Sequence, residues 1–116
     1  MNNNELINVL FNSSFSAIAI ISKDGLIVDV NDEFCTILGL SKRNLLRLNY
    51  LDLLFTEDNE VLDTKKEIYD NLSGKRRFKT KYSKFVWLDY SLKYVNSQET
   101  ESFFVLFINH IHDEVE

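Results

Sequence analysis

The chain has 116 residues, of which 45% are hydrophobic and 27% are charged, which is typical of one folded domain and excludes disorder. The formal net charge of -5 argues against a nucleic-acid surface, because neutralising phosphates requires a basic patch. The single cysteine, Cys35, excludes an internal disulfide framework. No apolar run is long enough to span a bilayer and the first residues lack the basic segment of a signal peptide, so we expect a cytoplasmic chain.

The first 15 residues predict a short helix that caps the domain or joins two copies of it. Its apolar residues recur at the i, i+4 spacing of a helix. They form two opposed edges, so one edge can cover a sheet while the other meets the same helix of a second copy. The predicted dimer-interface residues are Leu6, Ile7, Val9, Leu10 and Phe11.

A β-hairpin is predicted next, with strands at residues 16–22 and 26–30. The turn between them contains Asp24 and Gly25, and this pair tolerates the positive φ that tight turns require. Two short helices follow. Asn31 is the expected N-cap of the first helix and Gly39 its C-terminal stop, and Ser41 caps a second helix that ends at Leu46.

Residues 50–55 predict a single helical turn, and Thr56 is the expected N-cap of the longest helix, over residues 57–72. Two acidic residues in its first turn interact favourably with the positive end of the helix dipole. Gly74 is expected just after its end. The one-sided apolar pattern predicts a helix packed on another element and consists of Val61, Leu62, Ile68, Tyr69 and Leu72.

Three strands are predicted at residues 76–82, 85–95 and 101–111. Apolar and polar residues alternate along the second strand, which is typical of a half-buried strand. The centre of the last strand, residues 103–108, is apolar at every position, which predicts a strand in the middle of a sheet with both faces covered. The element order predicts an α+β fold: a five-stranded antiparallel sheet with short helices and one longer helix packed on one face, plus the N-terminal helix.

Four short motifs follow this order, and together they resemble those of PAS (Per-Arnt-Sim) sensory domains over nearly the whole chain. The motifs are Asp-Gly-Leu-Ile-Val-Asp-Val-Asn at 24–31, the helix and turn from Phe34 to Ser41, Phe-Thr-Glu-Asp at 55–58, and Val-Trp-Leu at 86–88. The resemblance implies a sensor domain over residues 16–112 and a linker that starts at 113–116. It also implies an output domain in the same polypeptide, such as a histidine kinase or a diguanylate cyclase.

The chain departs from the resemblance in two places. The family usually ends its last strand with Asp-Ile-Thr, which couples the core to a signalling helix, whereas His110, Ile111 and His112 stand here. His110 and His112 are therefore the predicted signalling positions. The flavin-binding branch carries Asn-Cys-Arg-Phe-Leu, which is absent, and the histidine that usually ligates haem has no counterpart in residues 57–72. We expect no cofactor.

Catalysis and metal binding are disfavoured by the same sequence. It contains no Gly-x-Ser-x-Gly, no Gly-rich phosphate loop and no His-Glu-x-x-His. The acidic cluster at residues 24–33 is explained by a turn and a helix cap, so we expect no enzyme. His110 and His112 share one face of a strand and could hold a metal with Asp113 or Glu114, but two histidines at a strand end are an incomplete ligand set, and we assign no metal site.

Aromatic residues crowd the later strands, which indicates either a packed core or a cavity for a small apolar or planar ligand. Such a cavity would lie between the inner face of the sheet and the long helix. The predicted ligand-binding residues are Phe34, Leu38, Leu54, Ile68, Leu72, Phe78, Tyr90 and Phe107. A basic run from Lys75 to Lys84 is interpreted as a sheet edge protected by lysines, with a surface for an acidic partner as the alternative.

The resemblance favours a signal-sensing regulatory module that forms a homodimer, binds a small ligand or partner, and passes its state to the output domain. Two alternatives stay open: a dimerisation scaffold without a ligand, and a redox sensor that uses flavin.

Overall fold

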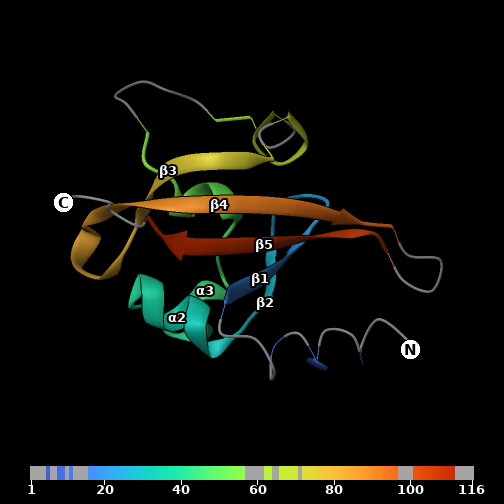
Figure 1. The fold of residues 1–116 in the computed structure, drawn as a ribbon, viewed down its shortest axis with the longest axis horizontal. Coiled ribbons are helices and arrows are strands. Elements are labelled where there is room, and N and C mark those ends of the chain that lie inside the picture. Colours follow the sequence, from blue (N-terminus) through green and yellow to red (C-terminus); the bar gives the residue numbers. More distant parts are fainter. Residues whose placement is uncertain are drawn as a thin grey trace.

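The computed structural model describes residues 16–56, 66–70, 72–96 and 101–111, together with residues 5, 8, 9, 11, 62 and 63. Its five strands form one antiparallel sheet in the order β2-β1-β5-β4-β3 (Figure 1), which confirms the predicted fold class. The strands are β1 (Ala17–Ser22), β2 (Ile27–Val30), β3 (Ser73–Lys79), β4 (Phe85–Val95) and β5 (Phe103–His110). The helical segments are α2 (Asp32–Leu38), α3 (Lys42–Leu45), η1 (Tyr50–Leu53), η2 (Lys66–Asp70) and η3 (Lys81–Ser83).

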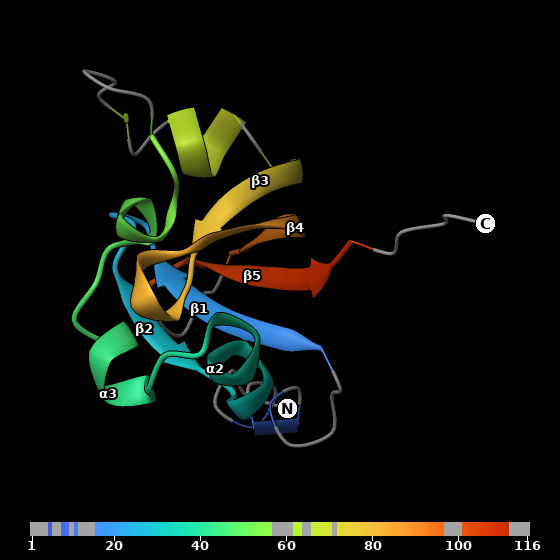
Figure 2. The ribbon, with the colours of Figure 1, turned by 90° about the vertical axis from the view of Figure 1, so that its left-hand side faces the viewer.

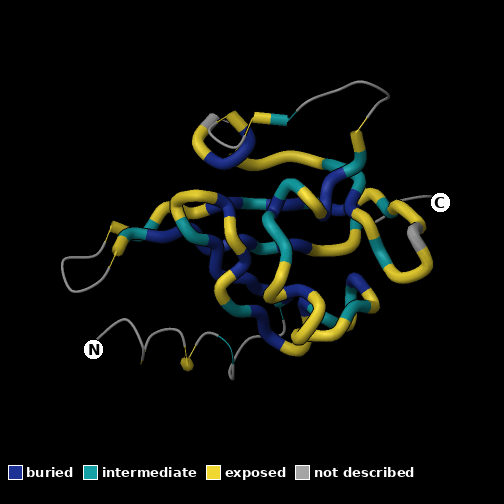
Figure 3. The backbone as a smooth tube through the Cα atoms, turned by 180° about the vertical axis from the view of Figure 1, so that it is seen from behind, coloured by how far each residue is buried: buried dark blue, intermediate teal, exposed yellow. Residues whose placement is uncertain are grey.

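The centre of the sheet is apolar on both faces, as predicted. β5 lies between β1 and β4, and Ala17 of β1 pairs with Ile108 of β5. Side chains on the inner face join the main core, and those on the outer face form a second cluster of Ile18, Ile20, Phe103 and Val105. Figure 3 shows the buried central strands in dark blue and much of the edge strand β3 exposed.

The helical segments cover one face of the sheet, which confirms the predicted one-sided arrangement. α2, α3, η1 and η2 each place buried side chains in the main core, beside the inner residues of the strands. Figure 2 shows α3 and the green η1 turn on the same side of the strands. The predicted caps of α2 are confirmed: Asn31 accepts a hydrogen bond from the amide of Phe34, and Gly39 takes the left-handed conformation.

The predicted long helix over residues 57–72 is the main difference. Leu62 and Asp63 are not helical, and the described helical residues of this region form a single π turn, η2. The stretch contains Asn59, Asp63 and Thr64, which are weak helix formers. Gly74 does not follow a helix end, because β3 already begins at Ser73, three residues before its predicted start.

The connection between β3 and β4 contains no glycine, and the structure shows how the chain turns there. Tyr82 takes the left-handed conformation with φ 65°, in the middle of η3. Thr80 closes the turn, because its amide and its hydroxyl both donate to the carbonyl of Lys84. β4 has the predicted bounds, and Leu88, Tyr90 and Leu92 point inward as the alternation predicts.

The structure describes only part of the predicted N-terminal helix. Glu5, Asn8, Val9 and Phe11 are helical, Val9 is exposed, and Phe11 packs against the outer cluster. The other predicted interface residues, Leu6, Ile7 and Leu10, lie outside the described residues. Within the described part of the chain, no helix is long and apolar enough to cross a membrane.

Candidate functional site

The site begins with the hairpin turn, which holds the start of η1 in place. The amide of Tyr50 donates to the carbonyl of Gly25 at 2.7 Å, and the Asn49 side chain donates to the carbonyl of Asp24 at 3.1 Å. A Cβ on Gly25 would lie 2.8 Å from Asn49 Oδ1, and φ at this glycine is +92°. Only glycine fits here without a shift, so the turn sequence fixes where Tyr50 lies.

Asn49 also caps η1 and thereby orients Tyr50 into the core. Its Oδ1 accepts from the amide of Leu51 at 3.0 Å, and its own amide donates to Asp52 Oδ2 at 2.9 Å. This reciprocal pair is a capping box, which satisfies the free donors at the start of a helical turn. The Tyr50 side chain is consequently fully buried.

The hydroxyl of Tyr50 is buried without a hydrogen-bond partner among the described residues. Burial raises the pKa of Tyr50 well above its ordinary value, and the neighbouring Tyr90 raises it further. The group is therefore a neutral phenol that keeps its proton and can both donate and accept. A buried polar group without a partner costs free energy, so this hydroxyl is a candidate for contact with a bound molecule.

An ion pair with little exposure lies on the same side of the sheet as this hydroxyl. Arg76 Nη1 donates to Glu67 Oε1, and the side chains of Arg76 and Glu67 are 21% and 6% exposed. Burial lowers the pKa of Arg76, but the hydrogen bond and charge of Glu67 outweigh it, so the net shift is upward and the guanidinium stays charged. Both Arg76 and Glu67 influence the pKa of Tyr50, which places the three groups within electrostatic reach of one another.

Strand register brings Arg76 inward. Arg76 pairs with Leu88 and Phe78 with Val86, so both β3 side chains face the helices. The ring of Phe78 lies 6.4 Å from the ring of Tyr50 and 6.3 Å from that of Tyr90. The site therefore consists of the Glu67–Arg76 pair, the Tyr50 hydroxyl, which has no hydrogen-bond partner among the described residues, and the rings of Phe78 and Tyr90.

Gly74 leaves room for Tyr90 on the same face of the sheet. Gly74 pairs with Tyr90, has φ +147°, and a Cβ there would lie 3.6 Å from Tyr90 Cε1. Tyr90 itself is 7% exposed. The chemistry of these side chains suits a molecule that has an apolar part and at least one hydrogen-bonding group.

Comparison with known proteins identifies the family. The family model of the PAS fold matches residues 5–111. The chain belongs to the PAS family. The resemblance drawn from the four sequence motifs is thus confirmed, and the protein is a PAS sensory domain.

Solved structures of other PAS domains share the fold at low identity. A PAS domain from a two-component sensor histidine kinase is 21% identical, with TM-score 0.72, covering 91% of this chain and 94% of that one. A PAS domain of an HTR-like protein from Haloarcula marismortui is 19% identical, with TM-score 0.72 and coverage of 93% and 91%. A PAS domain from the fruit-fly ELK potassium channel is 15% identical, with TM-score 0.74 and coverage of 96% and 98%. No curated protein matches the chain.

Six of the eight predicted ligand-binding residues of this PAS domain lie in one core cluster, and their contact with a ligand stays a prediction. They are Phe34, Leu38, Leu54, Ile68, Phe78 and Tyr90. The predicted inward position of Phe107 is wrong, because Phe107 lies on the outer face of β5 and packs against the outer cluster. Leu72 is also misplaced: it lies beyond η2, it is 46% exposed, and its carbonyl accepts from the amide of Leu92.

The polar members of the site were missed by the sequence reasoning. Arg76 belongs to the predicted basic run and Tyr50 to the predicted single turn, and Glu67 lies within the predicted helix over residues 57–72, where it was assigned no role. One signal was present: the period of two along a strand places Arg76 on the same face as Phe78.

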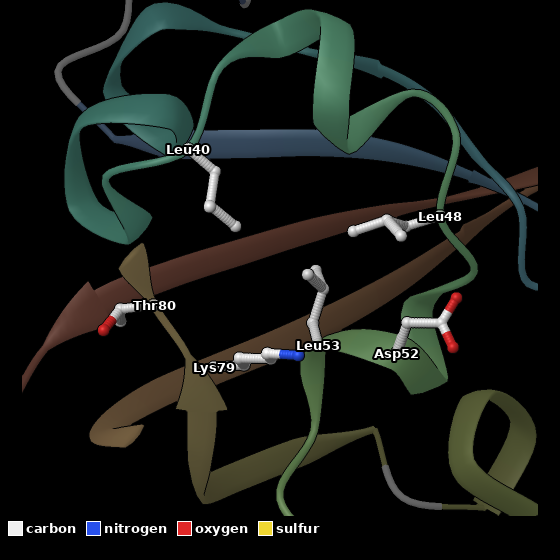
Figure 4. Close-up of a pocket in the computed structure, with 6 residues that line it drawn as sticks. All are labelled: Leu40, Leu48, Asp52, Leu53, Lys79 and Thr80. Atoms are coloured by element: carbon white, nitrogen blue, oxygen red, sulfur yellow. The ribbon is translucent and has the colours of Figure 1, made fainter. Parts of the chain in front are cut away.

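A separate surface cleft of about 440 Å³ lies next to η1. Figure 4 shows Leu40, Leu48 and Leu53 pointing toward a common centre, with the Lys79 ammonium beside Leu53 and the Asp52 carboxylate turned away. That carboxylate already accepts from the amide of Asn49. None of the predicted ligand-binding residues lines this cleft.

The rest of the basic run lies along β3 and in the turn that follows it. β3 is the edge strand, as the lysine-protected edge predicts. Lys75 forms an exposed ion pair with Asp89 at 3.4 Å, and the Arg77 guanidinium lies 3.8 Å from the Phe55 ring centre and 5.2 Å from that of Trp87. Arg77 therefore contributes to packing between aromatic rings, unlike its inward neighbour Arg76.

The predicted signalling and metal positions are only partly described. His110 is the exposed last residue of β5 and pairs with Leu88, and His112 lies outside the described residues. The described part of the chain contains no group of three or more metal-ligating side chains that could hold an ion. Burial raises the pKa of the Cys35 thiol, and the nearby Asp32 adds to the effect, so the thiol is a weak nucleophile.

Proposed function

We propose that this PAS domain is a signal-sensing regulatory module that binds a small ligand in its core beside Tyr50 and has no catalysis of its own. The observation that carries the proposal is the fully buried Tyr50 hydroxyl, which lacks a partner among the described residues and lies on the same side of the sheet as the Glu67–Arg76 pair. A buried hydroxyl without a partner lowers the stability of the folded state, and a ligand that supplies the partner recovers that free energy on binding.

In this proposal the domain spans residues 16–112 and residues 113–116 begin a linker to an output domain of the same cytoplasmic polypeptide. A histidine kinase or a diguanylate cyclase is the proposed output. The sensor histidine kinase that supplies one similar PAS domain supports the first of these, although the fold at 21% identity does not select the output. The signal would leave through the end of β5 at His110 and through His112, because a bound ligand favours one of two packings of the helical segments on the sheet.

A thermal-shift screen of the purified chain tests ligand binding. The panel holds small aromatic and aliphatic metabolites in anionic, neutral and cationic forms. We expect at least one member to raise the melting temperature, because a ligand that binds only the folded state stabilises it. An absorption spectrum of the same sample is expected to lack flavin and haem bands, and a flavin band would favour the redox-sensor alternative instead.

The Tyr50→Phe variant is the matched control, because it removes one oxygen and keeps the ring. Without ligand the variant should be as stable as the parent or more stable, since a buried hydroxyl without a partner is lost. Its ligand-dependent rise in melting temperature should be smaller. An unchanged rise would show that Tyr50 does not contact the ligand, and a panel without any active member would contradict ligand sensing by this core.

Dimerisation is the second proposed property, and the outer face of the sheet favours it. Ile18, Ile20, Phe103 and Val105 form an apolar cluster there, and Phe11 of the N-terminal segment packs against it. These four side chains are at most 9% exposed in one copy, whereas Val9 of the same N-terminal segment is 47% exposed. We therefore propose that a second copy covers the exposed apolar edge of the N-terminal segment.

Sedimentation of the full chain at about 50 micromolar is expected to show a dimer, and a Leu6→Asp, Leu10→Asp double variant should shift toward monomer because charges in an apolar interface are costly. An Asn8→Asp variant, with one new charge at a polar position of the same segment, controls for charge alone. A parent chain that sediments as a monomer would remove the scaffold alternative as well as the dimer.

A further inference from the structure

We infer that the ligand of the core site is a small monocarboxylate with a flat apolar body, and that its carboxylate takes the place of the Glu67 carboxylate on Arg76. The inference rests on the proposed function, since it specifies the chemistry of the same site. Four features of the described residues lead to it.

The first feature is the charge balance of the core. Arg76 points inward from β3 and its charge is neutralised by Glu67, which is 5% exposed. A carboxylate ligand that replaces Glu67 leaves one guanidinium paired with one carboxylate, so the buried charge is unchanged. An amine ligand would have to displace Arg76, which extends from a strand paired with β4, whereas a carboxylate displaces Glu67, which lies on a π turn outside the sheet.

The second feature is the geometry of the donors. A guanidinium presents its N–H groups in a planar fork that matches the two oxygens of a carboxylate. Glu67 receives one hydrogen bond from Arg76 Nη1. The Tyr50 hydroxyl, within electrostatic reach of both groups, has no partner among the described residues. A ligand carboxylate bound between Arg76 and Tyr50 gains a hydrogen bond that the Glu67 carboxylate does not make.

The third feature is the wall of the site. The rings of Tyr50, Phe78 and Tyr90 follow one another at 6.4 Å and 6.3 Å, with tilted or edge-on geometry. Rings inclined to one another offer edge and face contacts to a flat apolar body and no further charge. The ligand therefore carries its polarity at one end, at Arg76 and Tyr50.

The fourth feature is the element that carries Glu67. η2 is a π turn over five described residues, and its contacts include buried Ile68, the edge-on packing of Tyr69 on Phe104, the Glu67 amide that donates to Asp63, and the Glu67–Arg76 pair. π turns are rare and are frequently found at functional sites. Because the pair is one of the contacts that hold η2, a ligand that takes the place of the Glu67 carboxylate removes one of them, which couples binding to the position of η2.

Three probes of nearly equal shape test the inference on the full chain: phenylacetate, phenylacetamide and phenethylamine. Titrations are followed by calorimetry and by the Nε–H resonance of Arg76. We expect phenylacetate to bind at least about tenfold more tightly than phenylacetamide, because a charge-assisted pair with arginine is lost in the amide. Phenethylamine should not bind, and only phenylacetate should shift the Arg76 resonance.

Variants of Glu67, which competes with the ligand for Arg76, and of the groups around it test the proposed exchange of carboxylates most directly. Glu67→Gln should tighten phenylacetate binding severalfold, because the ligand no longer displaces a charged group from Arg76. Tyr50→Phe should weaken it about tenfold, the effect of losing a hydrogen bond to a charged group. Arg77→Gln, on the outer face, is the matched control for Arg76→Gln and should leave affinity unchanged, whereas Arg76→Gln should abolish binding.

Two results would overturn the inference while the proposed function stands. One is tighter binding of phenethylamine or phenylacetamide than of phenylacetate. The other is a thermal-shift panel in which only neutral or cationic members are active. If Glu67→Gln weakens phenylacetate binding in a folded variant, the exchange of carboxylates is also excluded. A panel with no active member removes the proposed function together with the inference.

Discussion

Replacement of Asn31 by alanine is expected to lower the free energy of unfolding by about 3 kcal/mol, because one 5%-exposed side chain joins α2 to β1. Its Oδ1 accepts from the amides of Phe34 at 3.0 Å and Ile18 at 2.9 Å, and its Nδ2 donates to the carbonyl of Ser16 at 2.8 Å. Loss of the helix cap accounts for about 1 kcal/mol, and the buried amide of Ile18 left without a partner accounts for about 1–3 kcal/mol.

Denaturant unfolding of three variants measures this effect. Ser41→Ala removes an exposed cap, whose Oγ accepts from the amide of Asn44 at 3.2 Å, and should cost about 1 kcal/mol or less. Asn31→Asp keeps an acceptor oxygen for both amides but turns the donor to Ser16 into a carboxylate oxygen that repels the Ser16 carbonyl, so its cost should lie between the other two. If Asn31→Ala is no worse than Ser41→Ala, the link from α2 to β1 does not stabilise the fold.

Asn31 also illustrates what the sequence could predict. Its role as N-cap follows from a local pattern of a polar residue, two acids and an apolar face, and Gly39 follows from the end of that face. The bond from Asn31 to Ile18 spans 13 residues and has no local signal. Local chemistry therefore predicted both caps of α2, whereas the hydrogen bond that ties α2 to β1 required the structure.

The predicted helix over residues 57–72 failed for a related reason. Apolar spacing favoured a helix there, but Leu62 and Asp63 are not helical and Leu72 already bonds to β4. The stretch has weak intrinsic helix preference, so tertiary contacts decide its conformation. Only the single turn η2, whose residues Glu67 and Ile68 contact the core, is described as helical.

The candidate site likewise has one part that local sequence patterns predict and one part that they do not. Its apolar wall could be predicted, because Phe78 and Tyr90 lie on strands with a regular period. Phe107 was misassigned because residues 103–108 of the central strand β5 are all apolar, so the pattern does not distinguish the two faces of the strand. The Tyr50, Glu67 and Arg76 group depends on the register of β3 and the position of η2, which no local motif specifies.

Breaking the Glu67–Arg76 pair from either side is expected to destabilise the protein, and the two sides should differ. Arg76→Met leaves the Glu67 carboxylate, 6% exposed, without its counter-ion and should cost about 3–4 kcal/mol. Glu67→Leu leaves the more exposed Arg76 unpaired, which water partly compensates, so about 2 kcal/mol is expected. Lys75→Met, which breaks the exposed pair with Asp89, is the control and should cost at most about 1 kcal/mol.

The double variant Glu67→Leu, Arg76→Met distinguishes a pair that stabilises the fold from a pair that serves ligand recognition. Apolar residues of similar size that replace both charges should restore stability to within about 1 kcal/mol of the parent or exceed it, because desolvating two charges offsets most of their attraction. A double variant as unstable as the sum of the single variants would show that the pair stabilises the fold itself. A double variant that is stable but no longer binds phenylacetate would show that the pair serves recognition, as the exchange of Glu67 for a ligand carboxylate requires.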